Sequence, residues 1–461
     1  MEKKNILIYG AGNNLTFSFY DLNRCYQIAA VMDGNEEKIG QRAFGLTISG
    51  ICDALKKEYD YIVVTPANAA GINEKLIDFG ADKKKIVSLQ EALNLIPEDD
   101  WEKCPETDVE ENGHIAVVMC GGMGDLLIGK VWLESVIRKY DISREEIEIY
   151  FAENLKSDGE YIFKDSVSRE NIHTIHTEAA DFFSGRYYKA VLRFCIVPEV
   201  WRKEIGLAGK STGDFYTYID RLWQYGKKHY NRGFISADGF CKTIRERLVD
   251  EPGVMYHTAF DVFGDLMSYA NIRELNIDKV RCEEYLEKTG LAGDTYITLN
   301  TGLNAEYRSK KNTRAWAFEK WVELSEALKR KYPNIKIVQV GLRMREEDDI
   351  PADLHMNGRT SLEQIVYLLK KSLLHIDYDG GLVHVRHMTG QKSIVLMGSS
   401  ASENHAYPEN VYIQTKECKP CEWTRPDWLS VCGRGCDTPI CMDSITVEMV
   451  MEKIKNELEE V

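Results

Sequence analysis

Short apolar runs that end at a glycine-rich turn recur along this chain, and they constrain its fold more than any other feature. Residues 6–9, 115–119 and 373–376 are three such runs. Apolar runs of this length, separated by stretches long enough to form a helix, are typical of parallel strands that are buried on both faces. Glycines that follow such strands lie at the sheet edge where α/β folds bind their ligands. The pattern therefore predicts an α/β protein whose glycine turns are candidate ligand sites.

The apolar runs group into three α/β units. A chain of 461 residues is long enough for about three domains, at roughly 100–200 residues each. Between the first two units lies a segment with two prolines and eight acidic residues, a composition typical of a linker. We expect the following division: an accessory Rossmann-like domain at 1–96, an acidic linker at 97–113, larger domains at 114–285 and 286–445, and a C-terminal helix at 446–461.

Charge and hydropathy exclude several classes of function. The chain has 58 Lys and Arg against 73 Asp and Glu, a net charge of −15, so we expect no nucleic-acid binding through bulk electrostatics. No apolar run approaches the roughly 18–20 residues needed to cross a membrane. The N-terminus also lacks the pattern of a signal peptide. We therefore expect a cytoplasmic protein.

A basic and aromatic stretch at residues 221–232 departs from this acidic character. It mixes Trp and Tyr with Arg, Lys and His, so it could hold an acidic acceptor or contact anionic lipid at the inner face of the membrane. A solvated helix face is the simpler interpretation.

The first glycine turn has the beginning of a nucleotide-binding pattern. Gly10 and Gly12 follow an apolar run, and Asp33 ends the next run, where a ribose-binding acid would lie. Glycines at this position let a phosphate approach backbone N–H groups. The third glycine of the pattern is replaced by Leu15. Two interpretations stay open: a cofactor site at Gly10, Gly12 and Asp33, or a purely structural turn.

The second turn places an acid directly after glycines. Gly122 and Gly124 precede Asp125 at the end of the run 115–119. Asp125 could act as a general base on an incoming hydroxyl group. Alternatively, it caps the helix that we expect to begin at Leu126.

The third turn is a second anion-binding candidate. Asp379, Gly380 and Gly381 follow an apolar run, and His384 comes one helical turn later. Adjacent glycines before a helix can hold an anion on backbone N–H groups. His384 alone would be more typical of a structural histidine, but its place in a second glycine turn favours a functional one.

Residues from about 114 to 445 resemble glycosyltransferase family 9, the heptosyltransferase family. The resemblance rests on motifs that occur in the same order and with the same spacing. The matching segments are 115–119, 122–125, 299–302, 314–316, 318–321, 357–362, 379–384 and 393–398, followed by Cys418, Cys421, Cys441 and Met442. The resemblance implies a GT-B fold, in which two Rossmann-like domains face each other.

The same resemblance implies an inverting glycosyltransferase that transfers a heptose-like sugar from a nucleotide-diphosphate donor. Asp125 matches the proposed general base of the family. The donor would be bound by residues of the glycine turns and their neighbours. These are Gly122, Gly124, Thr301, Arg314, Asp379, Gly380, Gly381 and His384. No catalytic metal is expected, because a cation and oriented N–H dipoles can stabilise a departing diphosphate.

Residues 1–96 are similar to small Rossmann domains attached to bacterial polysaccharide-biosynthesis enzymes. The likeness rests on residues 8–12, 31–35 and 39–45. Together the two resemblances imply a role in surface polysaccharide or glycoconjugate synthesis within cell-envelope biogenesis. The acceptor would be a glycan, a lipid-linked glycan or a protein.

Three positions depart from the family pattern, and two of them, Gly380 and Ala317, support an alternative function. Gly380 replaces the usual Ser or Thr, Arg314 replaces a frequent Lys, and Ala317 replaces a proline. A catalytically inert GT-B scaffold that binds a nucleotide sugar or a partner is therefore the second hypothesis. An epimerase or dehydrogenase is disfavoured, because the N-terminal unit contains no Tyr-x-x-x-Lys motif.

Five cysteines crowd near the C-terminus, at Cys418, Cys421, Cys432, Cys436 and Cys441. In a reducing compartment such a cluster favours metal binding over disulfides. Four thiolates suit Zn or Fe, and the spacing of Cys418 and Cys421 is a common half-site. Resemblance to family members that hold an iron with four cysteines supports a structural metal. Reduced thiols in a surface loop are the alternative.

Overall fold

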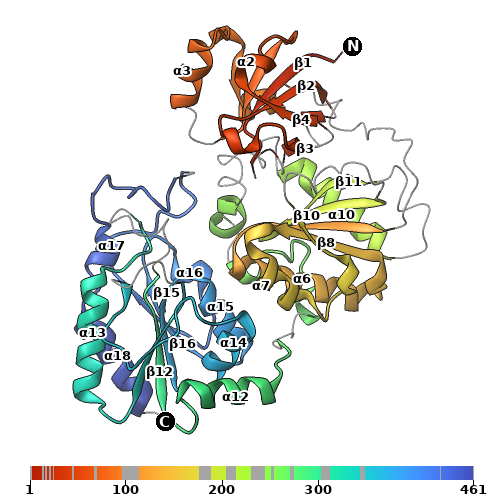
Figure 1. Ribbon diagram of the computed structural model, residues 1–461. Coiled ribbons are helices and arrows are strands. Elements are labelled where there is room, and N and C mark those ends of the chain that lie inside the picture. Colours follow the sequence, from red (N-terminus) through yellow and green to blue (C-terminus); the bar gives the residue numbers. More distant parts are fainter. Residues whose placement is uncertain are drawn as a thin grey trace.

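The computed structural model (Figure 1) describes most of the chain. The described residues are 3–12, 15, 18–19, 22–23, 25–43, 46–66, 70–95, 114–175, 188–203, 214–229, 244–250, 254–269, 275–302, 312–342, 348–425 and 427–459. The expected acidic linker at 97–113 lies outside them. Within the described ranges, no helix is both long enough and apolar enough to span a bilayer.

The N-terminal unit contains a six-stranded sheet in the order β3-β4-β2-β1-β5-β6, drawn in red and orange in Figure 1. Its strands are β1 (Asn5–Tyr9), β2 (Gln27–Met32), β3 (Arg42–Ala43), β4 (Leu46–Ser49), β5 (Tyr61–Val64) and β6 (Ile86–Ser88). The helices α2 (Ile51–Ala54), α3 (Ala70–Asp78) and α4 (Leu89–Asn94) accompany it. All pairings are parallel except that of β3 with β4.

Alternate residues of β1 pack into two different apolar clusters of this unit. Ile6 and Ile8 belong to one cluster, while Leu7 and Tyr9 belong to the other. Because successive side chains of a strand point to opposite faces, the sheet is buried on both sides. This confirms the prediction made from its continuous apolar runs.

The middle unit contains a five-stranded sheet in the order β11-β10-β7-β8-β9. Its strands are β7 (Ile115–Met119), β8 (Ile147–Ala152), β9 (Ile172–Ile175), β10 (Ala190–Cys195) and β11 (Val197–Lys203). Its helices include α6 (Met123–Tyr140), α7 (Lys156–Phe163) and α10 (Asp214–His229), with a π-helix at Glu246–Asp250 and a 3-10 turn at Tyr256–Thr258. The antiparallel strand β11 was not expected from the sequence.

The C-terminal unit contains a parallel sheet in the order β14-β13-β12-β15-β16-β17. Its strands are β12 (Tyr296–Asn300), β13 (Lys336–Val340), β14 (Leu354–His355), β15 (Leu374–Tyr378), β16 (Ser393–Met397) and β17 (Val411–Gln414). Its helices are α12 (Lys279–Thr289), α13 (Phe318–Lys331), α14 (Leu362–Lys371), α15 (Gly381–Met388), α16 (Ser402–His405), α17 (Ile440–Asp443) and α18 (Val447–Glu459). The backbone N–H of Met449 donates to the Thr446 hydroxyl, as expected for an N-cap.

The middle and C-terminal units share one apolar core. The same cluster contains Trp132 and Leu133 of α6, which belong to the middle unit, and Leu382 and Val385 of α15, which belong to the C-terminal unit. The expected domain boundary at 285/286 falls inside α12, and Cys282 of this helix approaches the Glu363 carbonyl group of α14. The two units are therefore joined mainly through α6 and α15, the two helices that begin at the glycine turns.

Candidate functional site

The second glycine turn forms the beginning of α6 and fixes the Asp125 carboxylate. The helix begins at Met123 rather than Leu126, and Gly122 is its N-cap. The alternative reading of Asp125 as the N-cap is therefore wrong. Instead, Asp125 lies in the first helical turn, and its Oδ2 atom accepts the backbone N–H of Gly122 at 2.7 Å. Gly121 has φ +100°, and a Cβ there would lie 2.3 Å from Asp125 Oδ2, so this position requires glycine.

A tyrosine from a distant loop holds the other oxygen of Asp125. The Tyr256 hydroxyl donates to Asp125 Oδ1 at 2.6 Å. Burial raises the pKa of Asp125, while the hydrogen bond from Tyr256, the N–H of Gly122 and the charge of Arg314 oppose this shift. A carboxylate with a raised pKa and two fixed hydrogen bonds has the properties of a general base.

The third glycine turn lies directly against the second. A Cβ on Gly124 would lie 2.7 Å from Cδ2 of His384, and a Cβ on Gly381 would lie 2.8 Å from Cε of Met123. Helices α6 and α15 therefore meet at their N-terminal ends, where backbone N–H groups and the helix dipoles favour an anion. The structure thus brings together Gly122, Gly124, Asp125, Gly381 and His384, as the sequence predicted.

Histidine and tyrosine rings surround this junction. The Tyr256 ring stacks on His405 with 4.5 Å between ring centroids, and His405 forms a buried ion pair with Glu422 at 2.7 Å. His384 Nδ1 lies 2.6 Å from the Tyr407 hydroxyl. Of these rings only His384 was predicted from the sequence, because Tyr256, His405 and Tyr407 come from segments with no common spacing.

His384 is uncharged at neutral pH. Burial lowers the pKa of His384 to about 4, and the neighbouring His405 and His387 lower it as well, against the opposing effect of Asp379. Its imidazole can therefore offer or accept a hydrogen bond near pH 7, but it carries no positive charge there.

Arg314 supplies the positive charge beside the third turn. Its Nη2 atom lies 3.3 Å from Asp379 Oδ2, its Nε donates to the Ser400 hydroxyl at 3.2 Å, and the guanidinium lies over the Trp428 ring. Burial is the largest single influence and would raise the pKa of Asp379. The charges of Arg314 and His405 and a hydrogen bond from Ser400 together outweigh it and lower this pKa to about 2. Asp379 is therefore ionised at neutral pH, and it partly compensates the Arg314 charge inside the protein.

Thr301 and Gly380 lie at neighbouring strand ends. Thr301 is buried at the carboxyl end of β12, with its hydroxyl 3.4 Å from Nε2 of Gln339. Gly302 and Gly380 both pack on the Tyr378 ring, which ends β15. Because β12 and β15 are adjacent parallel strands, the expected donor-binding residues share one edge of the C-terminal sheet.

The five clustered cysteines do not form a metal-binding group in this structure. Cys418, Cys421, Cys432, Cys436 and Cys441 are all described and are all free thiols. Cys421 lies close to Cys432 and Cys418, since each of them contributes to raising its pKa after burial. Nevertheless, no three Cys, His, Asp or Glu side chains within the described ranges converge as metal ligands. The five described thiols fit Zn or Fe in chemistry, but as they are arranged here they do not converge on a common metal position.

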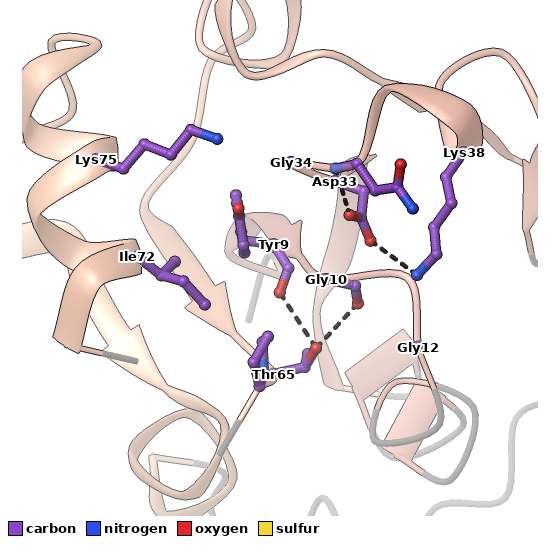
Figure 2. Close-up of a pocket in the computed structure, with 11 residues that line it drawn as sticks. Tyr9, Gly10, Gly12, Asp33, Gly34, Lys38, Thr65, Ile72 and Lys75 are labelled. Carbon is purple, nitrogen blue, oxygen red and sulfur yellow. Dashed lines mark hydrogen bonds and ion pairs between the residues drawn. The ribbon is translucent and has the colours of Figure 1, made fainter. Parts of the chain in front are cut away.

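The first glycine turn lines a separate pocket of about 510 Å³ in the N-terminal unit (Figure 2). Gly10, Gly12 and Asp33 all lie on its wall. Asp33 Oδ2 accepts the backbone N–H of Ala11 at 2.8 Å and lies 3.3 Å from Lys38 Nζ. The structure therefore brings the three predicted cofactor-binding residues together, with Lys38 as an addition that the sequence analysis missed.

The basic stretch at 221–232 is only partly described. Arg221 lies on α10, where its guanidinium contacts the Phe263 ring and its Nη1 donates to Asp265 at 3.2 Å. Residues 230–232 lie outside the described ranges. Membrane contact by this stretch stays a prediction.

Known proteins are similar to this chain in two regions: a family model matches the N-terminal unit, and solved structures match most of the chain. A family model described as C2185-like, N-terminal, matches residues 2–87. No curated protein sequence matches the chain.

Among solved structures, the chain is similar to a glycosyl transferase family 9 protein from Veillonella parvula, with a TM-score of 0.51 and 15% identity over 78% of this chain and 100% of that one. It is also similar to the iron-containing dodecameric glycosyltransferase TibC from enterotoxigenic E. coli, with a TM-score of 0.46 and 14% identity over 77% and 78% of the two chains. A third likeness is to ADP-heptose heptosyltransferase II of E. coli, with a TM-score of 0.44 and 13% identity over 75% and 99%. The likeness to the Veillonella protein shows that the middle and C-terminal units have the GT-B fold expected from the sequence.

Proposed function

We propose that this protein is an inverting glycosyltransferase that uses a nucleotide-diphosphate sugar as donor. The observation that carries the proposal is the junction of the two glycine turns, where Asp125 of the middle unit lies next to the N-terminus of α15. A base and an anion-binding helix end are the two groups that such a transfer needs, and here they come from opposite units of a GT-B fold.

In the proposed reaction, the acceptor hydroxyl attacks the anomeric carbon of the donor sugar. Asp125 takes the hydroxyl proton while the bond between the anomeric carbon and the diphosphate oxygen breaks. The diphosphate leaves with the electron pair of that bond. The N–H groups at the start of α15 and the guanidinium of Arg314 stabilise its negative charge. Attack from the face opposite the leaving group gives inversion.

Tyr256 acts as a positioning residue for the base. Its hydroxyl hydrogen bond fixes the Asp125 carboxylate, and its ring is stacked on His405 of the C-terminal unit. Tyr256 thus connects Asp125 of the middle unit to His405 of the C-terminal unit, the unit that would bind the donor. This is consistent with a base that must lie within hydrogen-bond reach of an acceptor placed between the units.

The substrates and pathway follow from the resemblance to family 9. We propose a heptose-like sugar donor, and a glycan, lipid-linked glycan or protein as acceptor, in bacterial cell-envelope glycoconjugate synthesis. A cytoplasmic location, with contact to the inner face of the membrane, belongs to the same proposal. A structural Zn or Fe at the cysteine loop also stays a prediction.

The test is transfer or donor hydrolysis measured across a panel of nucleotide sugars. We expect Asp125→Asn to reduce the rate by roughly 10²–10⁴-fold, the range typical of a general base. Asp141→Asn is the matched control, because Asp141 is exposed at the other end of α6, where its left-handed conformation suits asparagine. An Asp125→Asn rate within a few-fold of the wild-type rate would refute the base assignment.

The inert GT-B scaffold is the second candidate. It is favoured by the compensation of Arg314 by Asp379 and by the uncharged state of His384, which leave less positive charge for a diphosphate. A scaffold would bind a nucleotide sugar without consuming it. Binding without transfer or hydrolysis of any donor in the panel would therefore identify this alternative.

A further inference from the structure

The pocket of the N-terminal unit lies at the carboxyl ends of β1, β2 and β5, where α/β sheets bind their ligands. Figure 2 shows Lys75 of α3 on one side, Asp33 and Lys38 on the other, and Tyr9 between them. A volume of about 510 Å³ is sufficient for a small-molecule ligand. The glycosyl-transfer proposal uses none of these residues.

Two polar side chains of the pocket, Tyr9 and Lys75, can donate hydrogen bonds to a ligand. Tyr9 is 6% exposed, and its hydroxyl has no partner among the described residues. The Lys75 ammonium forms no hydrogen bond or ion pair with them either. A Cβ on Gly34 would lie 2.4 Å from the Tyr9 hydroxyl and 3.2 Å from Lys75 Nζ, so both donors converge on one point. Converging donors, one of them charged, favour an anionic acceptor such as phosphate.

Asp33 is not available to a ligand in the way that the sequence suggested. Its Oδ2 atom is occupied by the Ala11 N–H and Lys38, and its Oδ1 accepts the Asn35 N–H at 2.9 Å. A dinucleotide site uses the acid at this position to bind a ribose hydroxyl. Here Asp33 holds the glycine turn in place and draws Lys38 across it, so it is a positioning residue.

The two glycines of the turn have different reasons to be glycine. Gly10 has φ +102°, and a Cβ there would lie 2.6 Å from Oγ1 of Thr65, so the fold itself requires glycine. A Cβ on Gly12 would meet no atom of the described residues within 4 Å, although Gly12 lines the pocket. The described residues therefore do not explain the glycine at position 12, whereas a ligand that lies against this backbone would explain it.

We propose that this pocket is a second ligand site, independent of the glycosyltransferase site, that binds a small molecule through a terminal phosphate or diphosphate group. Lys75 and the Tyr9 hydroxyl contact the phosphate, and the backbone at Gly12 lies against the rest of the ligand. We do not expect the pocket to bind a dinucleotide whose ribose must be recognised by Asp33, because both carboxylate oxygens of Asp33 already accept hydrogen bonds.

The experiment measures lysine acetylation of the full chain by mass spectrometry, with and without pyrophosphate, ADP, UDP or NAD⁺. Lys83 is the internal control, because it is exposed in the same unit but outside the pocket. We expect pyrophosphate or a nucleoside diphosphate to protect Lys75 and leave Lys83 unchanged. Protection of Lys75 by NAD⁺ alone, or by none of the four, would overturn the proposal.

A pair of variants then separates this site from the donor site. Lys75→Met should weaken binding of the protecting ligand by about tenfold or more, as expected for loss of one charged hydrogen bond, while Lys83→Met should have no effect. Both lysines are exposed, so melting temperatures should stay close to that of the wild type. Equal affinity of the two variants for the protecting ligand would contradict the proposal. Because the two sites are independent, glycosyl transfer by Lys75→Met should equal that of the wild type.

Discussion

At the scale of single residues, the most informative contact is that between Tyr256 and Asp125. The hydrogen bond from Tyr256 lowers the pKa of Asp125 against the effect of burial, which raises it. As the proposed base, Asp125 must be ionised to accept a proton, so activity should fall as the pH drops through its pKa. Because burial dominates, the acidic limb should lie above the ordinary Asp value of about 3.9.

Tyr256→Phe should move this acidic limb to still higher pH, because the variant loses a hydrogen bond that stabilises the ionised carboxylate. At pH values well above the limb Asp125 is ionised in both proteins, so the loss of rate that remains there measures the positioning effect of Tyr256. The measurement is kcat/KM against pH, with Tyr269→Phe, an exposed tyrosine of the same unit, as the control. A uniform loss of rate with no shift of the limb would argue against the effect of Tyr256 on the Asp125 pKa.

The pair of Arg314 and Asp379 shows how the site limits its own charge. The sequence motifs place Arg314 and Asp379 near the proposed donor. Only the structure shows that the two side chains lie 3.3 Å apart. Against burial, the Arg314 charge together with His405 and Ser400 holds the Asp379 pKa at about 2, below the ordinary value, so these interactions contribute stability at neutral pH. This contribution is fully present above pH 4 and is lost as the pH falls through about 2. A diphosphate ligand would have to compete with Asp379 for the guanidinium.

At the scale of elements, the site depends on two helices whose first turns touch. Gly124 allows this approach, because a Cβ there would overlap the His384 ring, whereas a Cβ on Gly381 would meet only the flexible end of Met123. Neither residue has a positive φ, so the requirement for glycine comes from helix packing rather than from backbone conformation. Sequence patterns identify such glycines without showing which partner they touch.

Gly124→Ala should impair transfer without abolishing the fold. The added methyl group would lie 2.7 Å from the His384 ring, so α6 and α15 must move apart. A misplacement of about 1 Å can cost on the order of 10²-fold in rate. The measurement is kcat of the purified variant. Gly71→Ala on α3, where a Cβ meets nothing within 4 Å, is the control, and a wild-type rate for Gly124→Ala would contradict this account.

At the scale of the whole molecule, the chain contains an accessory unit attached to a two-unit GT-B body. The apolar cluster that fills the middle unit continues into α14 and α15 of the C-terminal unit. The two clusters around the N-terminal sheet contain only residues of that unit. The middle and C-terminal units should therefore unfold together, and the N-terminal unit separately.

Scanning calorimetry of the full chain should accordingly show two transitions. Phe194→Ala removes a buried ring that stacks on Trp132 and should destabilise only the GT-B body, by about 3–5 kcal/mol. Leu7→Ala, in the core of the N-terminal sheet, should destabilise only the other transition, by about 2–5 kcal/mol. A single transition, or a shift of both in either variant, would contradict this division.

The sequence by itself determined the central apolar strands, the glycine turns and the three α/β units, because apolar runs and glycines act within a few residues of the chain. It also placed Asp125 and His384 in facing turns. Only the tertiary structure decided the partners of these residues. Tyr256 reaches Asp125 across 131 positions, the aromatic and histidine rings come from unrelated segments, and Asp33 is held by its own turn instead of facing a ribose. Such contacts depend on how helices and units pack, which no local pattern of residues records.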